Sequence, residues 1–443
     1  MANIEFPQKG MSREKLFSEL RSLKSGDSDW KHGRMFSLVF NPGDETSAVA
    51  EEAYTLFMVE NGLSPFAFPS LLKMETEVAS MMANLFHGDQ DTVGNMTSGG
   101  SESIMVAVKA ARDYSRGKKP HILRPELLMP LSAHPAFNKA AHYLGLKTVI
   151  VPTGKETLAA DIEAMGRAIT ENTVMMVGSA PSYPHGIIDP IKDLAGLAAD
   201  HQIWMHVDAC VGGLELPFVK KLGYPLPDFD FQIPGVCSIS ADIHKYGFTP
   251  KGASVILYRN PEMRKHQIFA YADWPGGVYA TPNVSGSRPG GPIGSSWAVL
   301  RYLGMEGYMN LAAKSMETTK RLIKGIESIP ELYVLGNPPT TVFAIGSEVL
   351  NIFALGEKMK EYRWTIDSQH LPPCLHMTIS PIHAGIVDPF LADLRQAVKE
   401  TARLKPEDIS GEAAMYGMIG SLPDRGLAES FAVQYLNDLY RVH

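Results

Sequence analysis

The spacing of apolar residues along the chain changes near residue 92. Before that point three segments have the periodicity of helices: residues 12–24, 46–60 and 69–86. In the third segment Leu71, Val78 and Met82 fall on one side of the predicted helix, together with Glu75. Pro69 suits the first helical turn, where its fixed φ is favourable and its missing N–H is not needed. The first part of the chain is therefore predicted to be helical.

From residue 92 onward, short β-rich runs alternate with helical stretches. The runs cover residues 148–152, 174–178, 203–209, 237–241 and 253–258. Between two of them, Asp189 is predicted as the N-cap and Pro190 as the first residue of a helix that ends near residue 200. Strands that alternate with helices indicate a mostly parallel sheet covered by helices on both faces. The sequence thus predicts an α/β fold.

Three units are expected along the chain. They are an N-terminal helical segment (residues 1–60), a large α/β domain (61–300) and a smaller C-terminal α/β domain (301–443). Residues 275–296 are rich in Gly, Pro and Ser, and we interpret them as a loop too long for a simple connector, hence functional or part of a subunit contact. Beyond this loop the pattern predicts a helix over 297–329, strands within 342–380 and a last helix over 427–442.

Composition and charge exclude several classes of protein. The chain has 443 residues, of which 45% are hydrophobic and 20% charged, so it is not a disordered chain. Its net charge of −7 gives no positive field for nucleic acid. The three cysteines are too few and too scattered for a disulfide framework or a thiolate metal site, so no metal is expected. No apolar run long enough to span a bilayer and no signal segment is found, and we expect a cytoplasmic protein without an integral membrane segment.

Two segments place groups that bind charge at the ends of predicted elements. The sequence Thr-Ser-Gly-Gly-Ser-Glu-Ser at residues 97–103 opens a helix, whose free N–H groups and positive dipole end favour an anion. The run 203–209 leads to Asp208, with His206 on the same face, and a buried carboxylate is costly unless a cation pairs with it. Each has an ordinary alternative, a capped tight turn for the first and a loop-capping aspartate for the second.

Two further segments complete a set of chemical groups. Lys245 follows an apolar strand directly after His244, and apolar neighbours would lower its pKa and favour the neutral amine that forms Schiff bases. A solvated strand-end lysine is the ordinary alternative, as a core residue or helix cap is for His134. Together the four segments supply an anion turn for a phosphate, an imidazole for a ring face, an acid for a pyridine nitrogen and an amine for an aldehyde. These are the parts that a pyridoxal phosphate site requires.

Several motifs carry a resemblance to a known family. They are Pro-His-Gly at residues 184–186, His-Val-Asp-Ala at 206–209, His-Lys at 244–245, Tyr-Gly-x-x-Pro-Lys-Gly at 246–252 and Gly-Ser-Arg-Pro-Gly at 286–290. With them the chain resembles the fold-type I, group II pyridoxal-phosphate-dependent decarboxylases, most closely the bacterial sphingosine-1-phosphate lyases. The resemblance covers nearly the whole chain and implies an aspartate-aminotransferase-like fold and a homodimer.

The resemblance also implies a role for each matching residue. Lys245 would hold pyridoxal 5′-phosphate as a Schiff base and exchange protons with the substrate, Asp208 would pair with the pyridine nitrogen, and His134 would stack on the ring. Lys251 matches a lysine that binds the substrate phosphate in the lyases, and Arg288 is a second candidate anion ligand. The remaining cofactor contacts would be Gly100, Ser101, Ala209, His185 and His244, with Gly286 and Ser287 from the other subunit.

Two positions depart from the lyase pattern. Phe40 and Ser64 stand where the lyases carry a tyrosine and a histidine that contact the substrate phosphate, so hydrogen-bond donors are missing there. The resemblance nevertheless implies a carbon–carbon lyase of sphingolipid metabolism, which cleaves sphingosine or sphinganine 1-phosphate to a fatty aldehyde and phosphoethanolamine.

Two other functions stay open from the sequence. An amino-acid α-decarboxylase would use the same cofactor on a small-molecule amine, with Arg288 as the candidate ligand of the carboxylate. A non-catalytic scaffold is the other alternative, against which the joint presence of Lys245, Asp208 and His134 argues.

Overall fold

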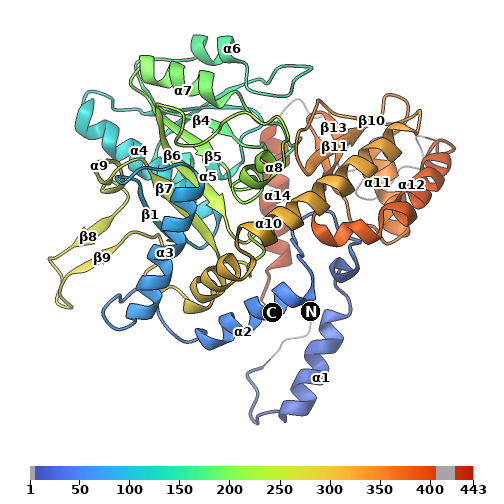
Figure 1. The fold of residues 1–443 in the computed structure, drawn as a ribbon, viewed down its shortest axis with the longest axis horizontal. Coiled ribbons are helices and arrows are strands. Elements are labelled where there is room, and N and C mark those ends of the chain that lie inside the picture. Colours follow the sequence, from blue (N-terminus) through green and yellow to red (C-terminus); the bar gives the residue numbers. More distant parts are fainter. Residues whose placement is uncertain (1–4, 406–424, 443) are drawn as a thin grey trace.

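Seven strands form the main sheet of the computed structural model, which describes residues 5–405 and 425–442 (Figure 1). In spatial order they are β1 (Val93–Thr97), β7 (Ser254–Tyr258), β6 (Val236–Asp242), β5 (Trp204–Asp208), β4 (Thr173–Ser179), β2 (Glu126–Pro130) and β3 (Lys147–Val151). Strand β7 is antiparallel to both of its neighbours, and the other pairings are parallel. The predicted mostly parallel sheet is confirmed.

Helices cover both faces of this sheet, as predicted. One face packs against α4 (Gly100–Lys118) and α5 (Ala136–Leu144), where Ile104 and Phe137 belong to one buried apolar cluster. The other face packs against α3 (Pro69–Leu85), α7 (Ile191–Asp200) and α8 (Leu216–Lys221) in a second cluster. Two short helices complete this part of the chain, α6 (Ile162–Arg167) and α9 (Pro261–Arg264). Pro69 begins α3 in its first turn, as expected.

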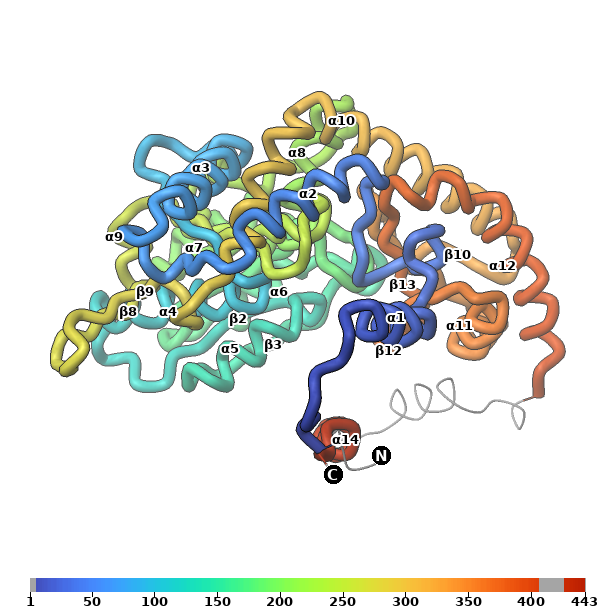
Figure 2. The backbone as a smooth tube through the Cα atoms, turned by 90° about the horizontal axis from the view of Figure 1, so that it is seen from below, coloured from blue at the N-terminus to red at the C-terminus, as the bar shows by residue number. Residues whose placement is uncertain are grey.

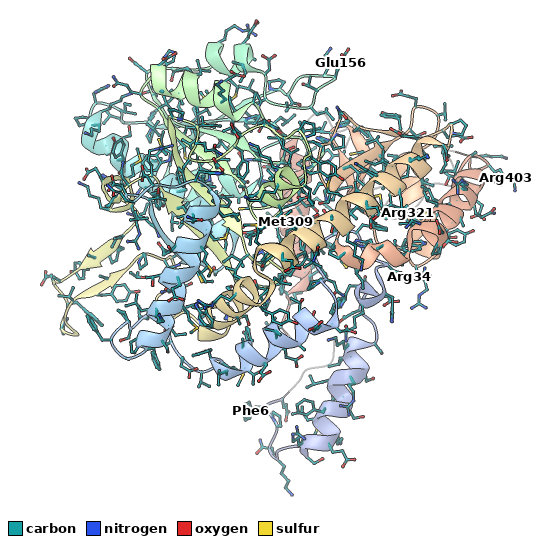
Figure 3. All side chains as sticks on the ribbon, viewed as in Figure 1. Phe6, Arg34, Glu156, Met309, Arg321 and Arg403 are labelled. Atoms are coloured by element: carbon teal, nitrogen blue, oxygen red, sulfur yellow. The ribbon has the colours of Figure 1, made fainter. Side chains whose placement is uncertain are left out.

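A smaller antiparallel sheet lies in the C-terminal part of the chain. Its order is β10 (Tyr333–Val334), β11 (Val342–Gly346), β13 (Pro373–Thr378) and β12 (Asp367–His370), with α11 (Ile352–Glu361), η2 (Pro381–Gly385) and α12 (Val387–Thr401) packed beside it. Phe36, from the N-terminal segment, is fully buried in this sheet's core. Arg34 (labelled in Figure 3) places its guanidinium 4.4 Å from the Trp364 ring. The N-terminal segment is thus anchored to the C-terminal part, while the division at residues 60 and 300 stays a prediction.

The terminal helices lie at the periphery of the molecule. Helix α1 (Arg13–Lys24) has no buried residue, and α14 (Arg425–Leu439) corresponds to the last predicted helix. Figure 2 shows both away from the main sheet, whereas α2 (Asp44–Leu56) lies along α10. A single 3₁₀ turn, η1 (Trp30–His32), separates α1 from α2. Within residues 5–405 and 425–442, no helix combines the length and the apolar character needed to cross a membrane.

The prediction of one long loop over residues 275–296 is wrong. Strand β9 (Tyr279–Thr281) lies within these residues and pairs with β8 (Phe269–Tyr271), which precedes them, and α10 (Gly290–Glu327) takes up their last part. The Gly-rich start of α10 is helical because it packs closely on α2. A Cβ at Gly291 would lie 2.9 Å from ring atoms of Tyr54. Helix α10 then runs to the smaller sheet, with a break at Gly304 (φ 53°, ψ −169°) and with Met309 beyond it, as Figures 1 and 3 show.

The predicted N-cap of α7 is also wrong. Pro190 is the N-cap residue, and no side chain caps this helix. Asp189 instead accepts hydrogen bonds from the backbone N–H groups of Ala160 (2.8 Å) and Ser179 (2.8 Å), and it is fully buried. A tertiary contact therefore takes the carboxylate away from the local capping role that the sequence indicates.

Candidate active site

The candidate site lies at the edge of the main sheet where parallel strands end. Asp208 is the last residue of β5 and Asp242 the last residue of β6, and these strands are neighbours. Helix α4 begins directly after β1 at the same edge, because β1 and β6 are both antiparallel to β7. The carboxyl ends of strands in such sheets are where ligands bind.

Asp208 is a buried residue, and only one of its two carboxylate oxygens accepts hydrogen bonds within the chain. Its Oδ1 accepts hydrogen bonds from the Cys210 N–H (3.0 Å) and from Oγ of Ser240 (3.4 Å). Its Oδ2 has no hydrogen-bond partner among the described residues, although the residue is only 6% exposed. A carboxylate oxygen without a partner inside the chain favours a cationic or N–H group, so Oδ2 is available to a ligand.

A buried chain of hydrogen bonds leads to Asp208. The indole N–H of Trp204 donates to Oγ of Ser238 (2.8 Å), which lies 2.8 Å from Nδ1 of His206. Nε2 of His206 lies 3.2 Å from Oγ of Ser240, which contacts Asp208. Desolvation lowers the pKa of His206 to about 4, so its ring is neutral and each member can donate toward Asp208. Sequence analysis placed His206 and Asp208 on one face but missed the two serines that join them.

Lys245 lies within an ion pair that the sequence analysis did not identify. Its Nζ is 3.0 Å from Oδ2 of Asp242, and the side chains are 20% and 3% exposed. Burial by itself lowers the pKa of Lys245, but the carboxylate of Asp242 and the more distant groups of Cys210 and Asp208 outweigh it and raise that pKa. The expectation of a lowered pKa is therefore wrong for the cofactor-free chain. The prediction assumed apolar neighbours, but the carboxylate of Asp242 lies beside the amine of Lys245 and favours its charged form.

The turn before α4 forms a cradle beside these groups. A Cβ at Gly100 would lie 2.8 Å from Sγ of Cys210 and 3.0 Å from both carboxylate oxygens of Asp242, so only glycine fits there. A Cβ at Gly99 would lie 3.3 Å from Cε1 of His244. Ser101 is exposed in the first turn of α4, whose N–H groups have no partner within the helix. The predicted anion site therefore brings together Gly100, Ser101 and His244.

Glu102 supports this turn from behind, a role that sequence analysis missed. It accepts hydrogen bonds from the N–H groups of Ser98 (2.6 Å) and Val284 (2.7 Å), and is buried. Burial raises the pKa of Glu102, but these backbone hydrogen bonds prevail and lower it. A glutamate three residues after an N-cap is a usual sign of such a bond, here to Ser98 rather than to Gly99.

His134 lies next to the charged cluster. Its Nδ1 accepts a hydrogen bond from the Ala136 N–H (3.1 Å) at the start of α5, which holds the ring, although Pro135 is the N-cap residue of that helix. Desolvation lowers the pKa of His134, and the ring interacts electrostatically with Asp208, Lys245 and Asp242. The ring is thus neutral, exposed and fixed beside Asp208.

Ala209 and His185 occupy buried positions near Asp208. Ala209 is fully buried behind it, with its N–H donated to the Ser240 carbonyl (2.9 Å). His185 is 4% exposed, and neither of its ring nitrogens has a hydrogen-bond partner among the described residues. Desolvation, aided by His376, lowers the pKa of His185 to about 4. The charged group that acts on His185 is His376 and not Lys245, so the place of His185 at the cofactor stays a prediction.

The structure separates the loop around Arg288 from Lys245. Arg288 donates to both oxygens of Glu75 (2.7 and 2.9 Å) and to the Gly62 carbonyl (2.8 Å), so its guanidinium is engaged inside the chain. Ser287 is exposed and accepts a hydrogen bond from the Asn61 side chain (3.1 Å). Gly286 precedes it in the same loop. Ser64 caps a local turn by accepting from Ala67 (3.3 Å). None of these residues forms a hydrogen bond or ion pair with Lys245 or Asp208 in the described part of the chain.

Phe40 and Lys251 share a cavity of about 590 Å³ next to His244. Nζ of Lys251 lies 5.2 Å from the Phe40 ring centre, and the Phe40 ring packs edge-on against Tyr246 at 4.9 Å. The other lining residues are mostly apolar: Trp30, Val39, Asn41, Pro42, Ser47, Ala50, Glu51, Tyr54, Thr55, Phe248, Thr249 and Pro250. The cavity therefore offers one cation beside an extended apolar wall.

These residues fit pyridoxal 5′-phosphate. The turn at Gly100 and His244 suits its phosphate, the free Oδ2 of Asp208 suits its ring nitrogen, and Lys245 carries the amine for its aldehyde. The Oδ2 atom of Asp208 has no hydrogen-bond partner among the described residues, and this agrees with a ligand that completes the site. Within the described residues, no cluster of three or more His, Cys, Asp or Glu side chains is arranged for a metal ion.

Comparisons with known proteins agree with this reading. The model of the pyridoxal-dependent decarboxylase conserved domain matches residues 1–342. Sphingosine-1-phosphate lyase of Oryza sativa subsp. japonica is 43% identical over 98% of this chain and 81% of its own length. Sphingosine-1-phosphate lyase 1 of Rattus norvegicus is 40% identical over 98% of this chain and 76% of its own.

Comparison with solved structures identifies the same family of proteins. Sphingosine-1-phosphate lyase of Burkholderia pseudomallei superposes with a TM-score of 0.91 at 38% identity, covering 100% of this chain and 98% of that one. Glutamate decarboxylase of Lactobacillus brevis shares the fold, with a TM-score of 0.80 at 16% identity, over 91% of this chain and 96% of that one. The chain therefore belongs to the pyridoxal-dependent decarboxylase family and, within it, to the sphingosine-1-phosphate lyases.

Proposed function

We propose that this chain is a pyridoxal-phosphate-dependent carbon–carbon lyase, which cleaves sphingosine or sphinganine 1-phosphate to a fatty aldehyde and phosphoethanolamine. One observation carries the proposal. The cluster of Lys245, Asp208 and His134 adjoins, through His244, a largely apolar cavity with Lys251 in its wall. A cation for a phosphate and an apolar wall for a long chain match a phosphorylated long-chain amine.

The chain's own residues each have a task in such a reaction. When bound, pyridoxal phosphate supplies an electron sink for the pair of electrons left when a bond to the substrate Cα breaks. The carboxylate of Asp208 would hold a proton on the ring nitrogen, and the exposed ring of His134 would fix the orientation of the cofactor ring. Lys245 would carry the cofactor and, once displaced by the substrate amine, move protons at the substrate carbon.

The structure weakens the decarboxylase alternative. That reaction needs a cationic ligand for the substrate carboxylate, and Arg288 is the candidate from the sequence. Its guanidinium is instead bound by Glu75 in a two-point ion pair, with the side chains only 13% and 10% exposed. Breaking such a pair would leave a buried carboxylate without a partner, which is costly.

A product assay tests the proposed function. Cofactor-loaded protein would be mixed with sphinganine 1-phosphate, and mass spectrometry would quantify fatty aldehyde and phosphoethanolamine. Formation of both products in equal amounts, absent with the Lys245→Ala variant, supports the lyase. Loaded protein that forms neither product overturns it, and the same sample would then be tested for release of CO₂ from amino acids.

Lys251 is expected to make substrate binding depend on pH. Desolvation and the nearby charge of Lys245 lower its pKa to about 8, against an opposing effect of Asp242. The ammonium form binds phosphate, so KM should be lowest below pH 8 and rise as the pH passes through that value. Lys251→Met should raise KM by about 10- to 100-fold, as expected for the loss of a charged hydrogen bond. It should also remove the rise with pH.

The assay compares KM for sphinganine 1-phosphate in both proteins across this range, with Lys155→Met as the control for loss of an exposed lysine. An unchanged KM in the Lys251 variant would exclude Lys251 from the phosphate site.

The homodimer and the cytoplasmic location are also part of the proposal. The exposed Ser287 lies in a loop that Glu102 ties to the α4 turn, so a second copy could reach it. This supports the expectation that Gly286 and Ser287 serve the neighbouring subunit. Sedimentation of the cofactor-loaded protein as a monomer at assay concentrations would contradict it.

A further inference from the structure

We propose that Glu102 is a positioning residue that couples the two cofactor sites of the proposed homodimer. It joins two segments of its own subunit: the phosphate turn (residues 98–101), which opens α4, and the intersubunit loop (residues 284–287). The inference rests on the proposed function, in which Gly286 and Ser287 of this loop serve the cofactor of the neighbouring subunit.

Each carboxylate oxygen of Glu102 holds one of the two segments. Its Oε2 accepts a hydrogen bond from the N–H of Ser98 (2.6 Å) in the phosphate turn. Its Oε1 accepts hydrogen bonds from the N–H groups of Val284 (2.7 Å) and Ser285 (3.4 Å) in the intersubunit loop. Burial raises the pKa of Glu102, but these N–H donors outweigh burial and lower that pKa. The side chain is therefore charged while it holds both segments.

The two segments are exposed, whereas the carboxylate that joins them is buried. Glu102 is only 8% exposed, while Ser98 in the turn and Val284, Ser285 and Ser287 in the loop are exposed. The intersubunit loop thus presents side chains outward while its backbone is held from inside, as a contact with a second copy requires.

The flanks of the intersubunit loop are fixed to β1, the strand that leads into the phosphate turn. On one flank, the side-chain amide of Asn283 donates to the Met96 carbonyl (3.0 Å). On the other, Arg288 binds Glu75, which accepts a hydrogen bond from the Met96 N–H (3.1 Å). Within the described residues, Glu102 provides the hydrogen-bonded link between the loop and the turn itself.

A phosphate bound at the turn should therefore affect the neighbouring site. The N–H groups at the start of α4 have no partner within the helix, so a phosphate that accepts hydrogen bonds from them orders the turn. Through Glu102 this order extends to the intersubunit loop, which holds Gly286 and Ser287 in place for the second cofactor. The second cofactor then binds with a smaller loss of conformational entropy, so the dimer should load cooperatively.

Native mass spectrometry of partly loaded protein tests this coupling without any turnover. Cofactor-free dimer would be equilibrated with limiting pyridoxal 5′-phosphate, and dimers with none, one and two cofactors would be counted. At half saturation, independent sites leave about half of the dimers singly loaded, whereas a second site that binds about fivefold tighter leaves about a third. We expect a third or fewer in wild type.

The Glu102→Gln variant should abolish the coupling. Its side chain has the same length but only one oxygen that accepts hydrogen bonds, so it can hold the turn or the loop but not both. The singly loaded fraction should rise to about half. A purely structural role would lower Tm or weaken both sites alike and leave this fraction unchanged. Glu163→Gln removes an exposed carboxylate that pairs with Arg167 and should load like wild type.

Three results would overturn the proposal. They are a wild-type dimer with about half of its molecules singly loaded at half saturation, a Glu102→Gln dimer with the wild-type fraction, and a loaded protein that sediments as a monomer. The last result would also contradict the proposed homodimer, whereas the first two leave it in place. If the glutamine variant does not fold, Glu102→Asp, which keeps the charge on a shorter side chain, replaces it. Sphinganine 1-phosphate is not used, so failure of the product assay is a separate outcome.

Discussion

Replacing Lys245 with alanine is expected to abolish turnover, with a loss of about 10⁴-fold or more in kcat. The variant lacks both the amine for the cofactor aldehyde and the group that moves protons at the substrate carbon. It also leaves the buried carboxylate of Asp242 without its ion-pair partner, so we expect a lower Tm for the cofactor-free protein. The measurement is product formation from sphinganine 1-phosphate, together with the visible absorbance of the protein.

The controls separate chemistry from folding. Lys155→Ala removes an exposed lysine and should retain full activity. Added methylamine should partly restore activity to Lys245→Ala if the loss is chemical, because a small amine can fill the space of the missing side chain. A Lys245→Ala protein that keeps more than a tenth of wild-type activity would show that another group performs its task.

Replacing Asp208 with asparagine is expected to lower kcat by about 10²- to 10³-fold while the protein still takes up the cofactor. The asparagine side chain can keep the hydrogen bond from the Cys210 N–H, so the strand end should stay in place. It carries no negative charge to hold a proton on the ring nitrogen, so the electron sink is weakened. The absorbance of the loaded variant and its kcat would be measured on the same sample.

Ser240→Ala is the matched control for Asp208→Asn. It removes one hydrogen bond to Oδ1 of Asp208 and the link to His206, but keeps the carboxylate. We expect a smaller loss of kcat than in Asp208→Asn, because the charge remains. Near-normal turnover of Asp208→Asn would show that the carboxylate is not needed for the electron sink.

Sequence alone predicted the features that depend on strand and helix ends. The runs ending at Asp208 and before Lys245 are strands β5 and β6, and the turn at Gly100 opens α4. In a mostly parallel sheet these ends meet at one edge, so residues more than a hundred positions apart could be assigned to one site. Phe40 and Lys251, which the resemblance assigns to the substrate, line one cavity, and the binding of the substrate there stays a prediction.

The sequence could not predict contacts that depend on how the backbone turns after a strand. Asp242 directly follows the predicted run 237–241, but its ion pair with Lys245 requires the chain to fold back three residues after β6 ends. Asp189 had the pattern of an N-cap, but its carboxylate accepts hydrogen bonds from two N–H groups outside α7 and does not cap the helix. In both cases tertiary geometry decides which partner a carboxylate meets.

The close packing of α10 on α2 has a consequence for the length of the substrate chain. Gly291 lies against the Tyr54 ring, and Tyr54 also lines the cavity that we assign to the alkyl chain. A methyl group at position 291, as in Gly291→Ala, would press the tyrosine ring inward and shorten the space beyond it. Helix α2 would then limit the length of the alkyl chain that the cavity accepts. The residue at position 291 would change the preferred number of carbons in the substrate although it does not line the cavity.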